Sequence, residues 1–284
     1  EGRDRPCDDR SGFIPGLRKA SRHGGRELTR NMNLYHVDLH IHTVLSPCAE
    51  LDMGAPEIIA RCRDEGIDMI AITDHNSARN TEALSRASAG SGVAVINGLE
   101  VQSSEDIHII CLMPDGETAG VFEEWIVERL PCIRNIPDKF GTQLVIDENN
   151  IITGESGILL VQGIDATADE IVDRARAFGG ISILAHIDRP VYSYVAVLGM
   201  IPKDLEVDAV ELSANLSEKE ALQWLNETGG RPVIRSSDAH RIPDISIERT
   251  TPVLLKKPSF DELGLALKGI HGRRVLWPWG QDQT

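Results

Sequence analysis

The sequence predicts an α/β fold in which a parallel sheet closes into a barrel. From residue 34 onward, short apolar runs typical of buried strands alternate with segments that have the spacing of amphipathic helices. Strands separated by helices imply a parallel sheet, and about seven such units suggest a barrel. Polar residues recur where the predicted strands end, which is the rim on which barrels and open parallel sheets assemble their active sites.

The composition is ordinary for a globular protein. The chain has 284 residues, of which 41% are hydrophobic and 26% are charged, so it can bury a substantial core. No apolar run is long enough to span a bilayer and no signal peptide is visible, so we expect no membrane partner. The five cysteines are scattered and form no CxxC pair, which fits reduced thiols and a cytoplasmic location.

The net charge of −15 is unevenly distributed. Residues 1–31 carry eight Lys or Arg against five Asp or Glu, a net charge of +3, so residues 32–284 carry −18. An acidic body repels polyanions at long range, and long nucleic acid is therefore an unlikely partner. A small phosphorylated substrate remains compatible with this charge.

Two regions are expected along the chain. Residues 1–31 are rich in Gly and Arg and show no sustained periodicity, so we interpret them as a disordered basic tail. Because Met32 directly precedes the first predicted strand, this tail could also be an artefact of an early start codon or of expression. Residues 32–284 are predicted to form a single domain.

The first half of the barrel is predicted from apolar runs and helix-end signals. A strand at 34–39 is followed by a helix at 56–64, which Pro56 opens and Gly66 ends. A second strand is expected at 67–72. The pattern then predicts a helix at 77–89 and strands at 93–96 and 107–112.

The second half begins with a region, 114–180, that is too long for a single crossover and is predicted to hold an insertion. It contains a helix at 117–130, a hairpin around Asn149-Asn150, and a helix at 167–178 with the capping-box spacing of Thr167 and Glu170. The remaining elements are strands at 181–185, 209–212 and 232–236 and helices at 217–228 and 259–269.

The first strand ends in two histidines, His40 and His42. Alternate residues of a strand point to the same side, so the two imidazoles can bind one metal ion. Further polar residues follow the other strands: Asp74, His75, Glu100, His108, His186, Arg189, Asp238 and His240. Each alone has a structural explanation, such as a helix cap for Asp74. Their meeting on one rim favours a metal site.

Five short segments carry a resemblance to a known family. HIHT, TDHN, GLE, AHIDR and SDAH, in this order, resemble the motifs of the PHP (polymerase and histidinol phosphatase) superfamily of metal-dependent phosphoesterases. The resemblance covers roughly residues 34–240. It implies a distorted (β/α)7 barrel of the PHP type with two or three divalent ions at the strand ends. The carboxylate and imidazole ligands suit Mn, Fe or Zn.

The resemblance also implies how the ligands are shared among the ions. The first metal would be held by His40, His42, Glu100 and Asp238. Glu100 would bridge to a second metal, which His108 and His186 also hold. A third metal would be held by His75 and His240.

Three further positions are assigned by the resemblance. Several relatives have another histidine of the third site where this chain has Cys48. A thiolate can ligate zinc or iron, but a buried small apolar residue in the turn is an equally good interpretation. Asp74 would orient a ligating histidine. Arg189 would bind phosphate, although the sequence AHIDRP around it differs from the usual sequence of the phosphate-binding motif in related phosphatases.

The sequence thus predicts a hydrolase acting on phosphoric ester bonds, in which a metal-bridging hydroxide attacks a small phosphorylated substrate such as a nucleotide or short oligonucleotide. Histidinol-phosphate phosphatase and a nuclease are alternatives within the enzyme class. A catalytically silent PHP regulatory module is the alternative outside it. The sequence does not specify an oligomeric state.

Overall fold

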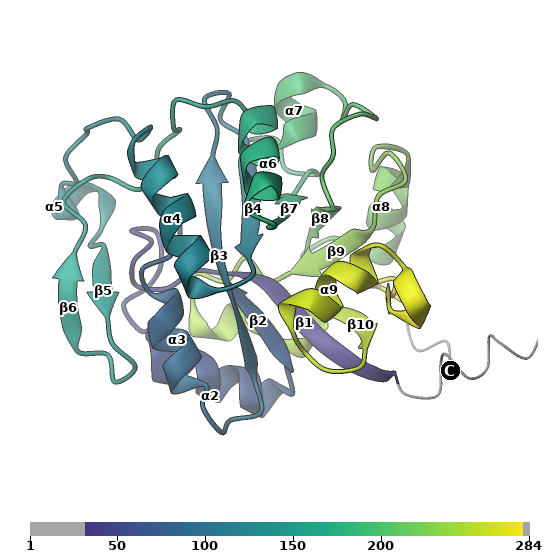
Figure 1. Ribbon diagram of the computed structural model, residues 1–284, viewed down its shortest axis with the longest axis horizontal. Coiled ribbons are helices and arrows are strands. Elements are labelled where there is room, and N and C mark those ends of the chain that lie inside the picture. The colour runs from purple at the N-terminus through teal and green to yellow at the C-terminus, as the bar shows by residue number, and fades with distance from the viewer. Residues whose placement is uncertain (1–31, 281–284) are drawn as a thin grey trace, which may run out of the picture. The chain divides into compact units, whose positions relative to one another are not determined.

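The structure is a computed structural model that describes residues 32–280 (Figure 1). The basic tail predicted at residues 1–31 lies outside the described residues. None of the helices in the described part is long and apolar enough to cross a membrane. Four cysteines lie in this part, and all four are free thiols, as expected.

Seven strands form a sheet that curls into a nearly closed barrel. In spatial order they are β1 (Asn33–Ile41), β2 (Met69–Ile72), β3 (Ala94–Gln102), β4 (His108–Met113), β7 (Ile181–Leu184), β8 (Ala209–Ser213) and β9 (Val233–Ser236). The segment after β9 returns to β1, where the His42 N–H donates to the Ala239 carbonyl at 3.0 Å. The Ala239 N–H in turn donates to the His40 carbonyl at 3.3 Å. The predicted barrel is therefore confirmed.

The expectation of an all-parallel sheet is wrong, because β4 runs antiparallel to both β3 and β7. Only residues 103–107 connect β3 to β4. A parallel connection needs a crossover of a dozen or more residues, so this short turn can only join antiparallel strands. As a consequence, the amino end of β4 lies at the same rim as the carboxyl end of β3.

Two strands that were not predicted extend the sheet beyond β1. β10 (Thr251–Leu255) pairs antiparallel with the first half of β1, and β11 (Arg274–Val275) pairs with β10. The apolar spacing around β10 is short and interrupted by Pro252, which is compatible with a strand near the edge of a sheet.

The helices follow the predicted order, with two short additions, α5 and α7. Their bounds are α2 (Ala55–Glu65), α3 (Thr81–Ala87), α4 (Gly116–Val127), α5 (Pro137–Phe140), α6 (Ala168–Ala177), α7 (Tyr194–Leu198), α8 (Glu218–Gln223) and α9 (Phe260–Leu267). Gly66 ends α2 in the left-handed conformation with φ of 75°. Thr167 and Glu170 form the predicted capping box of α6.

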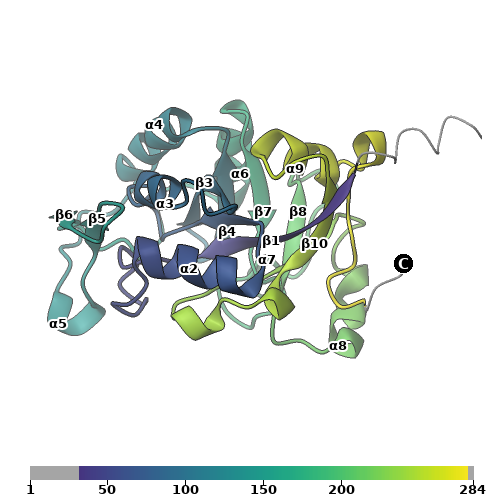
Figure 2. The same ribbon diagram turned by 90° about the horizontal axis from the view of Figure 1, so that it is seen from below.

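An apolar cluster fills the barrel. Residues from strands all round the sheet, such as Leu39, Ile110 and Ile183, are buried together with Leu263 and Ala266 of α9. Helix α9 packs against β10 and β11, α4 lies against β3 and β4, and α6 lies against β4 and β7 (Figures 1 and 2). Packing of this kind keeps the strand ends rigid, so side chains placed there hold fixed positions.

The predicted insertion lies between β4 and β7 and contains α4, α5, the hairpin and α6. The hairpin consists of β5 (Leu144–Ile146) and β6 (Ile152–Glu155) and forms its own two-stranded sheet (Figure 1). The buried Asn80 side chain ties β5 to the barrel, since it donates to the Leu144 carbonyl at 3.1 Å and accepts from the Ile146 N–H at 3.0 Å.

Phe122 tests whether the insertion packs tightly against the barrel. It lies on α4, is fully buried, and its ring lies 5.8 Å from Trp125 and 6.0 Å from Phe178. We expect Phe122→Ala to lower the free energy of unfolding by about 3–5 kcal/mol in urea titrations. The exposed neighbour Val121→Ala should change it by less than about 0.5 kcal/mol. Equal effects of the two substitutions would contradict this packing.

Candidate metal centre

The structure gathers the predicted ligands at one end of the barrel. They come from the ends of β1, β2, β3, β7 and β9 and from the start of the antiparallel strand β4. The histidines and carboxylates among them are buried except for partly exposed side chains after β9, whereas Cys48 lies on a separate turn and is exposed. Three groups of these side chains place their ligand atoms within 4.8 Å of one another: His40, His42 and Asp238; His75, Glu100 and His108; and His42, His75 and His240.

The first group has the geometry of a cation site. The Nε2 atoms of His40 and His42 lie 3.1 Å apart. Asp238 Oδ1 lies 3.3 Å from the first of these nitrogens and 3.2 Å from the second. Glu100 completes the group, with its oxygens 3.2 and 3.5 Å from the same two nitrogens.

A chain of hydrogen bonds fixes the tautomer of His42. The Ser46 hydroxyl donates to Asp74 Oδ1 at 2.7 Å, and its oxygen lies 2.9 Å from His42 Nδ1. Because the Ser46 proton is given to Asp74, His42 Nδ1 must be the donor to Ser46. The lone pair of His42 is therefore left on Nε2, which faces the first group.

Glu211 fixes His40 in the same way, and it is a residue that the sequence analysis missed. Its carboxylate lies 3.0 Å from His40 Nδ1 and accepts the His186 N–H at 3.1 Å. Glu211 lies on β8 and is 1% exposed. The available signal was an acidic residue inside an apolar strand, since a buried carboxylate requires a partner.

This arrangement needs a positive charge at its centre. Two imidazole lone pairs and two carboxylates face one another in a buried space, and they repel unless a cation lies between them. Burial lowers the pKa of His40, but the carboxylates of Glu211, Asp238 and Glu100 outweigh this effect and hold the pKa well above its usual value. The donor set of imidazoles and carboxylates fits a divalent transition metal.

Glu100 connects the first group to the second. Its Oε1 lies 2.8 Å from His108 Nδ1 and 3.3 Å from His186 Nε2. Burial raises the pKa of Glu100, but His108, His40 and His75 outweigh it and hold the pKa well below its usual value. The remaining ring nitrogens, His108 Nε2 and His186 Nδ1, are buried without a hydrogen-bond partner. Glu100 is thus placed where a bridging ligand is expected.

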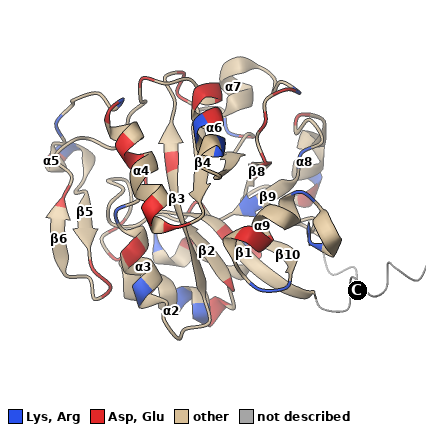
Figure 3. Cartoon of the chain, in the orientation of Figure 1, with Lys and Arg blue, Asp and Glu red and all other residues tan. Residues whose placement is uncertain are grey.

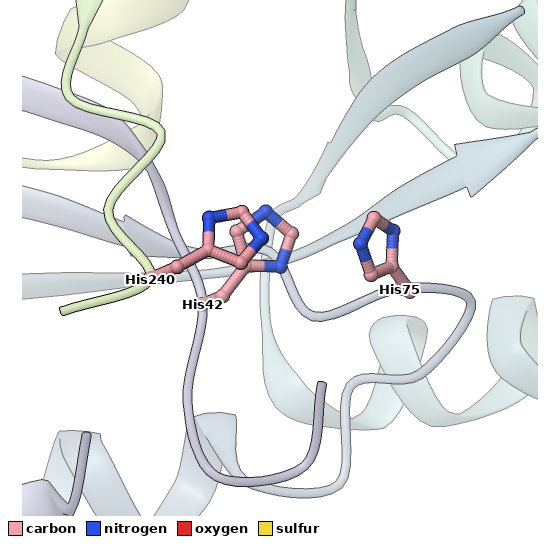
Figure 4. Close-up of side chains that lie close together, drawn as sticks. All are labelled: His42, His75 and His240. Carbon is pink, nitrogen blue, oxygen red and sulfur yellow. The ribbon is translucent and has the colours of Figure 1, made fainter. Parts of the chain in front are cut away.

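The third group consists of His42, His75 and His240, whose rings are shown in Figure 4. His75 Nδ1 also lies 3.0 Å from Glu100 Oε2, so His75 touches the second group as well as the third. The sequence analysis had placed His75 in the third group only. The three groups therefore form one continuous cluster rather than separate sites.

Cys48 lies beside the third group on a turn that is attached to it at both ends. Ser46 accepts the His75 N–H at 3.2 Å, and the Glu50 N–H donates to the His240 carbonyl at 2.8 Å. Cys48 is exposed, so its interpretation as a buried apolar residue is wrong. Desolvation raises the pKa of its thiol, but hydrogen bonds to His240 and His75 outweigh this and lower the pKa to about 6. Its role as a ligand stays a prediction.

Arg189, predicted to bind phosphate, and Asp74, predicted to orient a ligating histidine, occupy different positions. Arg189 lies on the solvent side of the cluster, with 39% of its side chain exposed and Nη2 2.5 Å from Asp238 Oδ2. Asp74 is 1% exposed and accepts hydrogen bonds from Thr43 and Ser46. Its carboxylate reaches His42 only through Ser46, so it is placed to position a ligand rather than to touch substrate.

Fold and site together define an α/β barrel with a candidate multinuclear metal centre at one rim. Residues 38–149 match the family model of the PHP domain, and this match confirms the resemblance of the motifs HIHT, TDHN and GLE. None of the curated proteins matches the sequence of the chain.

Solved structures of similar fold include the lesion-specific endonuclease PfuEndoQ from Pyrococcus furiosus, with a TM-score of 0.58, 18% identity and coverage of 86% of this chain and 58% of that one. A complex of Endonuclease Q with a 27-mer duplex containing an abasic lesion matches with a TM-score of 0.59, the same identity and the same coverage.

A two-domain protein from Bacteroides vulgatus, which contains a predicted PHP-like metal-dependent phosphoesterase, has a TM-score of 0.53, 16% identity and coverage of 87% and 65%. The chain thus spans 58% to 65% of the length of these proteins. The domain match supports the expectation of a hydrolase acting on phosphoester bonds, and the solved structures show the shared fold.

Glu211 provides a test of the ligand geometry. We expect Glu211→Gln to weaken the binding of Zn²⁺ or Mn²⁺ by about 10–100-fold, because the amide is a weaker acceptor for His40 Nδ1–H. Chelator competition measures this affinity. The exposed residue Glu218 on α8 supplies the matched control, Glu218→Gln, which should bind metal as the unmodified protein does. Equal affinity of the two variants would show that Glu211 does not position a ligand.

Proposed function

We propose that the protein is a metal-dependent phosphoesterase that hydrolyses a small phosphorylated substrate. The observation that carries this proposal is the convergence of the His40 and His42 Nε2 lone pairs on Glu100 and Asp238. The PHP domain at residues 38–149 supports it, as does the similarity in fold to a PHP-like metal-dependent phosphoesterase.

Two or three divalent ions are proposed as cofactors, with Mn, Fe or Zn as the metals that the ligand types suit. Their proposed ligands are His40, His42, Glu100 and Asp238 for the first, Glu100, His108 and His186 for the second, and His75, His240 and Cys48 for the third. Such ions, when bound, supply hydroxide near neutral pH and neutralise charge on the phosphoryl oxygens during in-line displacement.

The protein's own residues prepare the site for this chemistry. Glu211 and the Asp74–Ser46 pair hold two imidazoles with Nε2 directed at the first metal position, so no tautomer change is needed on binding. Arg189 is the cation at the solvent side of the cluster. Its guanidinium can donate to a phosphoryl oxygen, and such charge-assisted hydrogen bonds favour a phosphorylated substrate over a neutral one.

A small substrate is more compatible with the negative charge of residues 32–284 than long nucleic acid is. Helix α4, which belongs to the insertion, carries Glu117, Glu123 and Glu124 and no Lys or Arg (Figure 3). However, Endonuclease Q, a protein of similar fold, binds a DNA duplex with an abasic lesion at its active site. The expectation that long nucleic acid is an unlikely partner is therefore not supported, and nucleic acid stays a second candidate substrate.

A substrate panel tests the proposal. The protein is loaded with Mn, Fe or Zn in turn and offered phosphomonoesters including histidinol phosphate, cyclic nucleotides, short oligonucleotides and an abasic duplex, with released phosphate and cleaved strands as readouts. We expect turnover of at least one small substrate. Asp238→Asn should reduce it about a hundredfold or more, since even changes beyond the direct ligands cost 10–100-fold.

The exposed residue Asp261 on α9 provides the control Asp261→Asn, which should retain full activity. Cleavage of the abasic duplex alone would favour the nuclease. Absence of turnover on the whole panel by protein shown to contain metal would refute the proposal in favour of a silent regulatory module.

A further inference from the structure

An exposed aromatic side chain covers one of the candidate metal ligands. The ring of Tyr192 stacks on that of His108, with the centroids 4.6 Å apart and the planes inclined by 19°. Tyr192 is 43% exposed, whereas His108 is 8% exposed. One face of the tyrosine ring is therefore in contact with the metal centre, and the exposed part of the side chain lies at its solvent edge.

The backbone at Tyr192 is strained. Its φ of +58° lies in the left-handed region, which a bulky aromatic residue rarely adopts. Two candidate ligands of the same cluster, His186 and Asp238, also have positive φ values, of 31° and 49°. Strained residues of this kind persist where the surrounding structure holds them, and they concentrate at functional sites.

Several contacts hold the strained segment in place. The Tyr192 carbonyl accepts the His108 N–H at 3.0 Å. The Ser193 hydroxyl donates to the Arg189 carbonyl at 2.7 Å, and its oxygen accepts the Ala196 N–H at the start of α7. Arg189 is in turn paired with Asp238. One rigid loop thus carries both a guanidinium and an aromatic ring at the rim of the site.

We propose that Tyr192 is a stacking platform for the base of a nucleotide substrate, so that it determines specificity within the phosphoesterase activity proposed above. A nucleotide has the two groups that this arrangement can bind, a phosphate for the metal centre beside Arg189 and a flat base for the ring of Tyr192. Stacking of a base on an aromatic side chain requires no particular base, because every base has a π-face. A residue whose only role was to shield His108 from solvent would not need an exposed aromatic ring on a strained backbone.

Binding of AMP and of ribose 5-phosphate to the metal-loaded protein tests this role, because the two ligands differ by the base alone. Calorimetry gives both affinities, and released phosphate is followed in parallel. Tyr192→Asn and Tyr192→Gly remove the ring while keeping a residue that tolerates positive φ. We expect each substitution to weaken the binding of AMP by about 5- to 150-fold and to leave the affinity for ribose 5-phosphate unchanged.

Two variants serve as controls. Tyr192→Phe keeps the stacking face and should bind AMP as the unmodified protein does, and so should Val191→Ala, which alters the 56% exposed neighbour. The proposal would be overturned if Tyr192→Asn and Tyr192→Gly weakened the binding of AMP and of ribose 5-phosphate equally, or if both variants lost bound metal. Either result would show that Tyr192 only supports His108. Selective AMP binding without phosphate release from any substrate would instead support the stacking role and refute the phosphoesterase.

Discussion

The site depends on one buried interaction at the barrel rim. Two imidazole lone pairs and two carboxylates lie close together there and face the same point. Glu100 and Asp238 lie within 3.5 Å of the Nε2 atoms of His40 and His42, and all but Asp238 are nearly inaccessible to solvent. Burial of such a set is costly unless a cation balances it. Hydrogen bonds of the Nδ1 atoms of His40 and His42 to Glu211 and Ser46 leave only the Nε2 atoms free to coordinate this cation.

The fold supplies this arrangement through two features of the sheet. The return of the chain after β9 to β1 brings Asp238 and His240 beside the histidine pair. The reversal of β4 brings His108 beside Glu100, which no parallel strand in that place would do. The loop between β7 and α7 carries the polar residues that face solvent, Arg189 and Tyr192. Metal binding and substrate recognition are therefore built from neighbouring parts of one rim.

Much of this arrangement could be predicted from the sequence, because its signals are local. The spacing of His40 and His42, the capping box at Thr167 and the turn at Asn149-Asn150 each depend on a few neighbouring residues. The direction of β4, the pairing of β10 with β1 and the contact of Glu211 with His40 depend on residues far apart in the chain. Local patterns do not encode such pairings, and the left-handed backbone of Tyr192 is likewise imposed by its surroundings.

The most direct test of the account is anomalous diffraction from crystals grown with Zn²⁺ or Mn²⁺. The account predicts a peak between His40 Nε2, His42 Nε2, Glu100 and Asp238, at about 2.0–2.2 Å from the ligand atoms if the ion is zinc. A map without a peak at this position, with both Nε2 atoms instead protonated and hydrogen-bonded to the carboxylates, would contradict the central claim that this cluster is a metal centre.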